Sequence, residues 1–381
     1  MNDLFTEKEY QHFIMDYLKE QNGYRVRHAT KAGGDYDRRF AMDRGMLFEF
    51  LRATQPDVLA ELRKIYKDKT EDTVASFINS EITKRGSSII HVLKHGVDFS
   101  TSLHLDLMYT KPATDFNPEL TKLYVQNIFS VMEEVWPDDD TRVDLVLFLN
   151  GLAIISFELK CNPAGQNYED AIAQYRATRD PKNRLFLFKA GCFVHFAMDL
   201  EQCYMTTHLA GKSTYFLPFN RGCGTDINRG AGNDINPETG RGVDYMWEDI
   251  LKKDTVLDLI SKYIFVEVKE KIDQKTDEKK ISETLIFPRY HQLDCVRKVM
   301  ADVCEHGTKM NYLIEHSAGS GKTNTITWLA YRFASLHNAQ NKQIYDKIII
   351  VTDRVIVDQQ LQRAILAIEH KEGMVRPMDD K

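Results

Sequence analysis

The segment between Arg142 and Lys160 constrains the fold most strongly, because two apolar runs flank an Asn150-Gly151 pair. Asn-Gly between two strand-like runs is the strongest short-range signal for a β-hairpin. Val, Leu, Ile and Phe on both sides of the turn indicate strands that are buried on both faces. Almost the only charges inside the segment are Asp144, Glu158 and Lys160. Such charges are costly in an apolar setting unless they pair with each other or hold a metal.

The length of the turn decides whether these charges can share a site. A two-residue loop pairs Leu149 with Leu152 and places Asp144 opposite Phe157, so that Glu158 points to the other face. A three-residue loop, or a compensating bulge, places Asp144 opposite Glu158. Directly opposed residues have Cβ atoms about 4.5–5.5 Å apart, close enough for two carboxylates to share one divalent cation. We therefore expect one of these two arrangements, and a structural ion pair is the alternative to a metal site.

Asp144 and Glu158, with the backbone carbonyl of Leu159, form a candidate Mg²⁺ site, because Mg²⁺ prefers oxygen ligands and usually takes one or two carboxylates. Metal-assisted phosphodiester cleavage needs a Lewis acid on the scissile phosphate and an activated water. Lys160 would orient that water or neutralise developing charge. The pattern alone is weak, because residues 265–269 (FVEVK) also fit it. That second match runs into a charge-rich segment and is expected to lack a hairpin partner strand that carries an aspartate.

The composition is ordinary for a soluble protein of two or three domains, with 381 residues, 43% hydrophobic and 28% charged. The net charge of −6 excludes a global basic field, so any DNA contact depends on a local patch. The six cysteines show no metal-like spacing, which predicts free thiols in a reducing cytoplasm. The sequence shows no signal peptide and no apolar stretch long enough to cross a membrane, so no membrane partner is expected.

The remaining periodicity predicts an α/β protein around a mixed sheet. Thr6 is expected to cap the first helix in a capping box with Glu9. Further helices are expected at 45–66, 167–178, 246–251 and 254–263, and strands at 88–93, 102–109, 125–135, 184–189, 193–198 and 202–207. A long irregular loop is expected at 220–242. A charged linker is expected at 267–284, with an exposed helix as the alternative.

A second chemical signal lies at residues 311–323, where an apolar strand and a loop ending Gly319-Ser320-Gly321-Lys322-Thr323 precede a helix. In such a P-loop, backbone N–H groups hold phosphates, the lysine reaches the β and γ phosphates, and the threonine holds Mg²⁺. The strict pattern has glycine where this chain has His316. With the segments 287–292 and 347–361, the P-loop outlines a RecA-like nucleotide-binding sheet, and ATP and Mg²⁺ are the expected cofactors.

In their order along the chain, these motifs resemble the N-terminal part of the R subunit (HsdR) of type I restriction endonucleases. Residues 143–160 resemble the PD-(D/E)xK nuclease motif of that family. Similar flanking segments are Tyr36-Asp37, Phe50–Gln55, Gly230–Asn233 and Tyr245–Trp247, and residues similar to the first motifs of a superfamily 2 helicase are Arg289, Gln292, Gly319–Thr323 and Thr352–Arg354. The resemblance implies a restriction-endonuclease-like domain at 1–266, the linker at 267–284 and a truncated first RecA-like helicase domain at 285–381.

The resemblance also implies an activity and partners. Asp144, Glu158 and Lys160 would be the cleavage residues, Gln292 would contact adenine, and Lys322 with Thr323 would hold phosphates and Mg²⁺. The substrate would be double-stranded DNA, and the partners would be methyltransferase (M) and specificity (S) subunits. In the full-length protein, Mg²⁺-dependent phosphodiester hydrolysis would be coupled to ATP-driven DNA translocation.

The sequence departs from the family pattern at several positions. The family often has Gln four positions before Tyr in the helix after the nuclease lysine. Here Gln174 and Tyr175 are adjacent, Ala171 takes the expected place, and ordinary helix surface is the alternative reading. Glu9 is a candidate for the family's first-helix glutamate, although capping is its preferred role. No Asp-Glu box or second RecA-like lobe with its arginine finger follows the P-loop, so we expect a piece of a longer protein with an incomplete ATPase.

Two other functions remain open at this point. A nuclease–helicase of DNA repair explains the motifs but not the N-terminal resemblance. A non-catalytic DNA-binding or assembly module, in which the Asp-Glu-Lys cluster is structural, explains the burial of the charges without any chemistry.

Overall fold

The computed structural model describes residues 6–112, 116–224, 232–272, 279–338, 340–352 and 355–368. The chain forms two compact units: the first comprises Met1–Lys111 and Glu119–Leu257, and the second Pro112–Pro118 and Asp258–Lys381. Of the residues that carried the resemblance, Gly230, Ala231, Asp353 and Arg354 lie outside the described residues.

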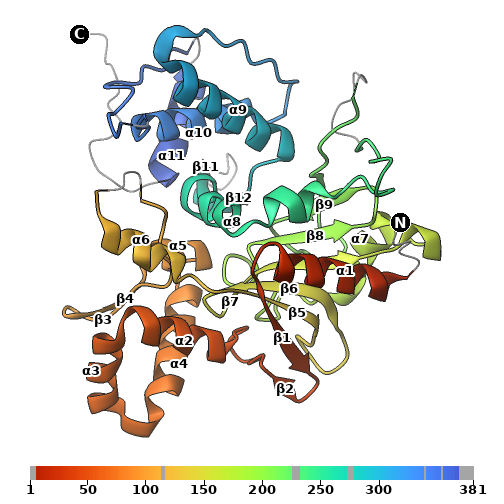
Figure 1. The fold of residues 1–381 in the computed structure, drawn as a ribbon, viewed down its shortest axis with the longest axis vertical. Coiled ribbons are helices and arrows are strands. Elements are labelled where there is room, and N and C mark those ends of the chain that lie inside the picture. The colour runs from red at the N-terminus through yellow and green to blue at the C-terminus, as the bar shows by residue number, and fades with distance from the viewer. Residues whose placement is uncertain are drawn as a thin grey trace. The chain divides into compact units, whose positions relative to one another are not determined.

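In the described part of the first unit, eight strands form one mixed sheet in the order β10-β9-β8-β7-β6-β5-β1-β2 (Figure 1). The pairs β1–β5 and β7–β8 are parallel and the other neighbours are antiparallel. The predicted mixed sheet is therefore confirmed. Its strands are β1 (Arg25–Thr30), β2 (Gly33–Gly34), β5 (Phe129–Val135), β6 (Val143–Leu149), β7 (Leu152–Leu159), β8 (Val194–Met198), β9 (Cys203–Thr206) and β10 (Leu217–Pro218). A separate small hairpin pairs β3 (Val97–Ser100) with β4 (Leu103–Leu105).

Helices complete the first unit, and the first of them begins at the predicted cap. The Thr6 side chain accepts a hydrogen bond from the backbone N–H of Glu9, and the Glu9 side chain accepts one from the backbone N–H of Thr6. The helices are α1 (Glu7–Glu20), α2 (Arg44–Thr54), α3 (Pro56–Tyr66), α4 (Thr70–Thr83), α5 (Ile89–His95), α6 (Pro118–Val125), α7 (Tyr168–Thr178), a π-helical turn at Met246–Ile250 and α8 (Lys253–Asp258), which ends at the unit boundary. In the described residues, no helix has both the length and the hydropathy of a membrane span.

Strands β6 and β7 lie at the centre of the sheet, and every residue of both is buried. This agrees with the apolar runs that flank the turn. The helix α7 follows β7 and covers part of the core, where Ala171 and Tyr175 pack with Val146 and Phe148. The central hairpin is thus surrounded by neighbours on both edges and by side chains on its faces.

Two of the strands predicted for the first unit are wrong. Residues 89–95 form helix α5, which Ser88 caps by accepting a hydrogen bond from the backbone N–H of His91 at 3.0 Å. The apolar residues there fit a helix as well as a strand, and the cap decides between them. The segment 184–189 forms turns. In contrast, strand β1 was not predicted, because its polar sequence RVRHAT shows no alternating apolar pattern.

The second unit begins with a feature that replaces the predicted charged linker. Strands β11 (Phe265–Ile272) and β12 (Lys279–Ile286) form an antiparallel hairpin across most of 267–284, so neither a linker nor an exposed helix is correct. Buried Phe265 and Leu285 anchor its base. Helices α9 (Tyr290–His306), α10 (Lys322–Ala334) and α11 (Val355–Ile368) follow, after a π-helical turn at Leu259–Tyr263 that precedes the hairpin.

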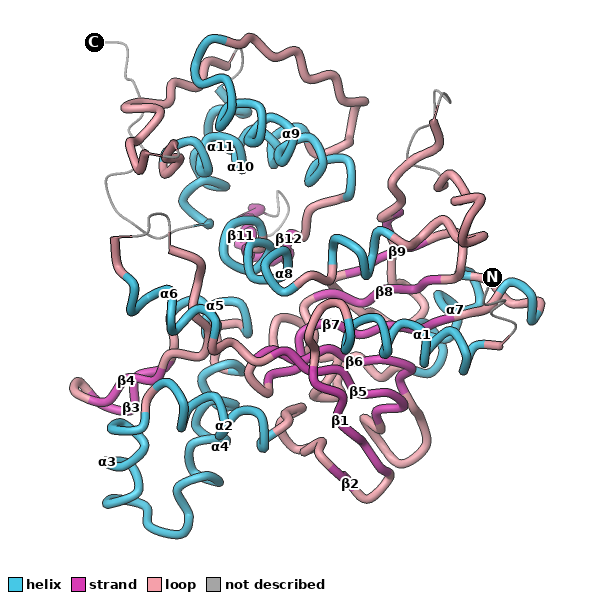
Figure 2. The backbone as a smooth tube through the Cα atoms, viewed as in Figure 1, coloured by secondary structure: helices cyan, strands magenta, loops and turns pink. Residues whose placement is uncertain are grey.

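The predicted RecA-like sheet is not formed in the described residues. The segments expected as strands, 311–315 and 347–351, are irregular, and they lie in the loops of Figure 2. Leu313 is 95% exposed and Val351 is 88% exposed, whereas strands of a parallel sheet are buried on both faces. A parallel strand also needs neighbours for its backbone N–H and C=O groups. Within the described part of this unit, the only paired strands belong to the β11–β12 hairpin.

Candidate functional site

The turn between β6 and β7 combines a two-residue loop with a β-bulge. Leu149 pairs with Leu152, as a two-residue loop requires, but farther along the hairpin Leu145 pairs with Phe157. The register shifts next to the turn, where Ile154 has no partner on β6. Of the two expected arrangements, the compensating bulge is confirmed and the three-residue loop is wrong.

The loop itself is fixed by its two residues. Asn150 and Gly151 both have positive φ, at 49° and 81°, as expected for the tight turn that Asn-Gly favours. The Asn150 side chain accepts a hydrogen bond from the backbone N–H of Ile128 at 2.7 Å and donates one to the carbonyl of Leu107 at 2.9 Å. A Cβ at Gly151 would lie 2.3 Å from the carbonyl oxygen of Asp43. The loop therefore has no space for a side chain at Gly151.

Continued by one residue beyond the Leu145–Phe157 pair, the register places Asp144 opposite Glu158. The Asp144 carboxylate accepts a hydrogen bond through Oδ2 from the backbone N–H of Leu159 at 2.6 Å, which joins the two strands at this point. Both carboxylates are buried, with 7% exposure for Asp144 and none for Glu158. Burial raises the pKa of Asp144 well above its ordinary value, and the charge of Glu158 raises it further. Burial also raises the pKa of Glu158, although Arg179 opposes the shift.

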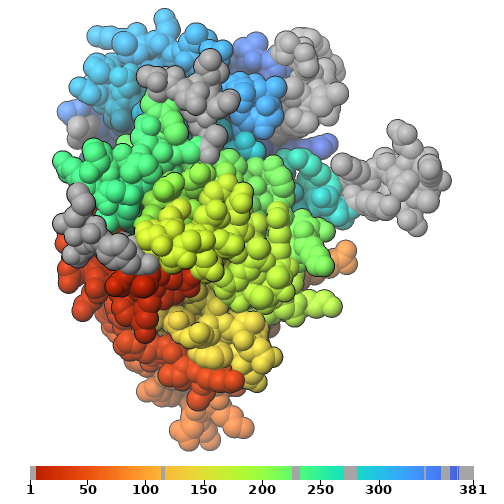
Figure 3. Space-filling model, turned by 90° about the vertical axis from the view of Figure 1, so that its right-hand side faces the viewer, coloured from red at the N-terminus to blue at the C-terminus, as the bar shows by residue number. Residues whose placement is uncertain are grey.

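Lys160 lies beside the two carboxylates, with 5% exposure, and is held from two sides. Its Nζ donates to Glu7 Oε2 at 2.8 Å and to the carbonyl oxygen of Leu159 at 3.0 Å. The space-filling view shows the red N-terminal segment, which includes α1, beside the yellow-green segment that follows β7 (Figure 3). The acidic residue of the first helix at this cluster is therefore Glu7, whereas Glu9 forms the cap. Sequence reasoning missed Glu7 because only Glu9 fitted a local motif.

Arg179 is the second residue of the cluster that sequence reasoning missed. Its Nε donates to Glu158 Oε1 at 2.6 Å, and its Nη2 donates to the carbonyl oxygen of Arg142 at 2.5 Å. The other carboxylate oxygen, Glu158 Oε2, is buried and has no hydrogen-bond partner. Arg179 lies at the end of α7, and no local pattern connects that position with the hairpin.

The donor set fits a divalent cation. A buried carboxylate oxygen without a partner is costly, and a bound ion is one of the accepted explanations for such a group. Within the described residues, no group of three or more His, Cys, Asp or Glu side chains could hold a metal ion. A cation here would therefore depend on Asp144, Glu158 and the Leu159 carbonyl, with water or substrate oxygens for the rest. Mg²⁺ commonly binds in this way.

A buried polar network that joins β7, α7 and β8 corrects one prediction. Tyr175 has no exposed surface, and its hydroxyl is 2.8 Å from Ser156 Oγ, which is 2.7 Å from His195 Nδ1. Helix surface is therefore wrong for Tyr175, whereas Gln174 is partly exposed. Ala171, at the position where the family often has Gln, is buried in the core.

The second match to the nuclease pattern, at residues 265–269 on β11, lies in a different environment. As expected, it lacks a partner strand with an aspartate, because β12, which pairs with β11, carries none. Glu267 lies opposite Thr284, and Lys269 lies opposite Ser282. Glu267 and Lys269 form an ion pair with each other at 2.8 Å on a partly exposed face. This match is an ordinary surface ion pair.

The P-loop segment keeps part of its expected geometry. Gly319 and Gly321 have φ values of 74° and 83°, and α10 begins at Lys322, directly after the loop. The Lys322 Nζ donates to the carbonyl oxygens of His316 at 2.9 Å and Ser317 at 3.1 Å. Lys322 is exposed and Thr323, the next residue of α10, is partly exposed. A loop and a helix N-terminus are therefore present, but the strand that should precede them is not.

Gln292 contacts the P-loop rather than standing free. It is 3% exposed, and its Nε2 donates to the carbonyl oxygens of Ser320 at 3.1 Å and Gly321 at 2.9 Å. Its Oε1 accepts a hydrogen bond from the backbone N–H of Arg289 at 2.9 Å. Both amide hydrogens are thus engaged in fixing the loop. The expected contact of Gln292 with adenine stays a prediction.

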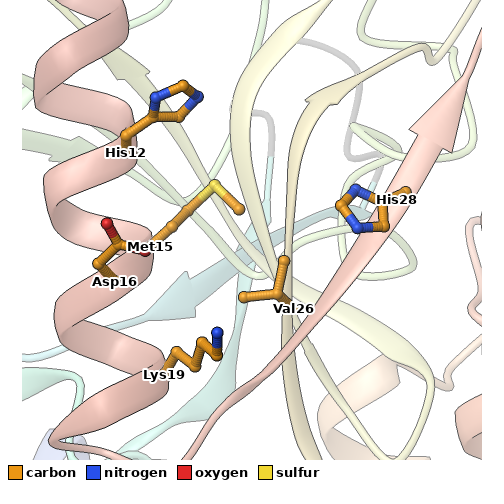
Figure 4. Close-up of a pocket in the computed structure, with 6 residues that line it drawn as sticks. All are labelled: His12, Met15, Asp16, Lys19, Val26 and His28. Atoms are coloured by element: carbon orange, nitrogen blue, oxygen red, sulfur yellow. The ribbon is translucent and has the colours of Figure 1, made fainter.

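A groove lies between α1 and β1, as shown in Figure 4. Asp144, Glu158 and Lys160 do not line it, so the groove is not the candidate site. His12 Nε2 lies 3.2 Å from Glu133 Oε2 beside it. Its lining residues are His12, Met15, Asp16, Lys19, Val26 and His28.

Together, the fold and the cluster define an α/β protein whose mixed sheet holds a buried carboxylate pair and a lysine at the end of its central hairpin. Residues 5–214 match the family model described as the type I restriction enzyme R protein N terminus. The chain belongs to this family. Residues 291–378 match the model of the SWI2/SNF2 ATPases.

Curated relatives agree with the family. The chain is 28% identical over 256 residues to the protein assigned as the endonuclease subunit of the type I restriction enzyme MjaVIIIP of Methanocaldococcus jannaschii, over 64% of this chain and 22% of that protein. It is 22% identical over 361 residues to the corresponding MjaIXP protein of the same organism, over 91% of this chain and 33% of the relative. The chain thus spans about a fifth to a third of the length of the curated relatives it matches.

Proposed function

We propose that this chain carries the Mg²⁺-dependent DNA cleavage site of the endonuclease (R) subunit of a type I restriction enzyme. One observation carries the proposal: the bulge in β7 brings Asp144 opposite Glu158, next to Lys160, at the buried end of the hairpin. Without the bulge, a two-residue loop would place the two carboxylates on opposite faces of the sheet. Family membership and the relatives' designation as endonuclease subunits support the same reading.

Each residue of the cluster has a distinct role in this proposal. Asp144 and Glu158 would hold Mg²⁺ together with the Leu159 carbonyl, and the Leu159 N–H fixes the Asp144 carboxylate. Bound Mg²⁺ supplies a Lewis acid for the scissile phosphate and lowers the pKa of a bound water. Lys160, which Glu7 holds in place, would neutralise charge that develops on the phosphate.

The wider activity of the full-length protein is part of the same proposal. The substrate is double-stranded DNA, the partners are the M and S subunits, and the complex works in the cytoplasm. The match of residues 291–378 to SWI2/SNF2 ATPases supports ATP binding at Gly319–Thr323 and an ATP-driven translocation of DNA by the complete motor. Cleavage would be coupled to that movement.

A structural, non-catalytic cluster is the second candidate, and two observations favour it. Arg179 pairs with Glu158, and Lys160 pairs with Glu7, so both basic residues already have acidic partners. Such a cluster can be kept without any chemistry, because loss of one member of a buried ion pair leaves the other charge uncompensated and costs about 3–5 kcal/mol.

The test uses Asp144→Asn and Glu158→Gln in the full-length, assembled restriction enzyme. Both variants keep the size of the side chain, so we expect cleavage to fall by more than about 100-fold, beyond what supporting residues around a metal typically cause. DNA binding and thermal unfolding are measured in parallel and should change little. The matched control is Glu267→Gln in the second sequence match, which should cleave normally. Full cleavage by Asp144→Asn, or unfolding of both variants, would support the structural cluster.

A further inference from the structure

Arg179 connects α7 to both strands of the central hairpin, at the end opposite the turn. The chain leaves the helix at this residue, with φ −98° and ψ 109°, and the side chain turns inward to 2% exposure. Its guanidinium donates to Glu158, near the end of β7, and to the carbonyl oxygen of Arg142, just before β6 begins. One side chain therefore fixes the two strand ends that bring Asp144 and Glu158 together.

The contact with Glu158 is one-sided. Both Nε and Nη2 lie 2.6 Å from the same oxygen, Oε1, and Nη2 is shared with the Arg142 carbonyl. Arginine–carboxylate pairs are frequently bidentate, with two parallel N–H groups on the two carboxylate oxygens. Here Oε2 is buried and without a partner. Arg179 therefore binds one oxygen of the Glu158 carboxylate and leaves Oε2 without a hydrogen bond.

Lys160 does not orient the Glu158 carboxylate. Its Nζ bonds Glu7 and the Leu159 carbonyl, and these bonds hold it at the edge of the cluster. Arg179 is therefore the cation that contacts Glu158 directly. A guanidinium suits this task, because its planar, rigid fork sets the orientation of the group it binds, which the flexible ammonium of a lysine does not.

We propose that Arg179 is a positioning residue for the metal site: it binds Glu158 through Oε1 alone and so presents Oε2 to the divalent cation. The inference rests on the proposed function, since it requires a cation at Asp144 and Glu158. Arg179 contacts neither the metal nor the DNA and acts only through Glu158.

The test measures metal binding separately from cleavage. The full chain is titrated with Mn²⁺, a substitute for Mg²⁺ at oxygen sites, with and without a short DNA duplex, and the free-ion EPR signal reports binding. The variants are Arg179→Met, which removes the cation, and Arg179→Lys, which keeps the charge without the fork. The matched control is Arg176→Met on the same helix, because Arg176 donates twice to the carbonyl oxygen of Thr214 and does not touch the hairpin.

We expect Mn²⁺ affinity to fall by about 10- to 100-fold in Arg179→Met, the range for partners that orient a metal ligand. Arg179→Lys should fall between that variant and the wild type, and Arg176→Met should equal the wild type. If Arg179 acts through Glu158, adding Arg179→Met to Glu158→Gln should cause no further loss. Should Arg179→Met fail to fold, Arg179→Lys decides, since it retains a buried cation: wild-type Mn²⁺ affinity in the folded lysine variant overturns the inference.

Failure of this inference differs from failure of the proposed function. If Asp144→Asn binds Mn²⁺ as the wild type does, there is no cation site at the cluster and both proposals fall. If Asp144→Asn abolishes binding while Arg179→Met and Arg179→Lys bind normally, the site stands and only the role of Arg179 is wrong.

Discussion

The hairpin cluster and the P-loop segment were both visible in the sequence, yet the fold completes them to different extents. At the hairpin, strands flank both sides and every residue of β6 and β7 is buried. At the P-loop, the glycine-containing loop and α10 are formed, but the preceding segment 311–315 is irregular and Leu313 is exposed. The comparison shows that a local motif fixes its own turn, whereas a site needs the neighbouring strands that hold the motif in place.

This difference predicts that substitution of Glu158 has the largest effect on the free energy of unfolding. Replacing it by alanine leaves Arg179 buried without its acidic partner, which should lower the free energy of unfolding of the first unit by about 3–5 kcal/mol. Glu158→Gln should cost clearly less, because its amide oxygen still accepts from Arg179. Urea unfolding monitored by tryptophan fluorescence measures both variants. Equal losses in the two would contradict this prediction and show that the pair depends on the charge of Glu158 and not on the hydrogen bond that glutamine keeps.

A matched pair of glycines compares the two loops directly. Gly151→Ala combines left-handed backbone strain, about 1–2 kcal/mol, with overlap against Asp43, about 1–3 kcal/mol, so we expect a loss of about 2–5 kcal/mol. Gly319 has a similar φ, but a Cβ there meets nothing within 4 Å. Gly319→Ala should therefore cost only the strain, about 1–2 kcal/mol. Thermal unfolding of both variants tests this order, and a larger loss at Gly319 would contradict the difference in packing.

The third prediction concerns pH. Burial, together with the smaller effect of the charge of His208, lowers the pKa of His195 to about 3. Above about pH 6.5 the imidazole is neutral in both states, and between 6.5 and 3 only the unfolded chain binds the proton. Stability of the first unit should therefore fall with decreasing pH, by about 2 kcal/mol between pH 7 and 5 from this residue alone.

His195→Asn isolates that contribution, because the neighbouring carboxyl groups titrate in both proteins. The unfolding free energy of the wild type and of His195→Asn is measured against pH, and the wild type should lose more of it as the pH falls. Parallel curves would mean that His195 binds its proton equally well in the folded and unfolded states. Near the P-loop, burial also lowers the pKa of His291 and His316, but both are partly exposed. The free energy of unfolding of the second unit should therefore depend less on pH.

The smallest effect is expected at Lys322. Its Nζ bonds two backbone carbonyls on an exposed loop, so Lys322→Ala should change the free energy of unfolding by no more than about 0.5 kcal/mol. If the loop holds phosphate as proposed, binding of a fluorescent ATP analogue to the full-length protein should weaken at the same time. A large loss of stability would show that the lysine is structural.

Much of the fold could be predicted from short patterns. The capping box of Thr6 and Glu9, the Asn150-Gly151 turn and the buried strands beside it all followed from local rules. The errors arose where tertiary context decides. The charge-rich segment 267–284 reads as a linker, but pairing of β11 with β12 makes it a hairpin. The apolar segment 347–351 reads as a buried strand, but no described strand pairs with it.

The sequence by itself determined the types and positions of Asp144, Glu158 and Lys160, because charges inside apolar strands stand out against their neighbours. The tertiary structure decided their register, since side chains alternate with a period of two and a single bulge residue moves a carboxylate to the other face. It also supplied Glu7 and Arg179. These residues come from helices distant in sequence, and only packing against the sheet brings their side chains to the cluster.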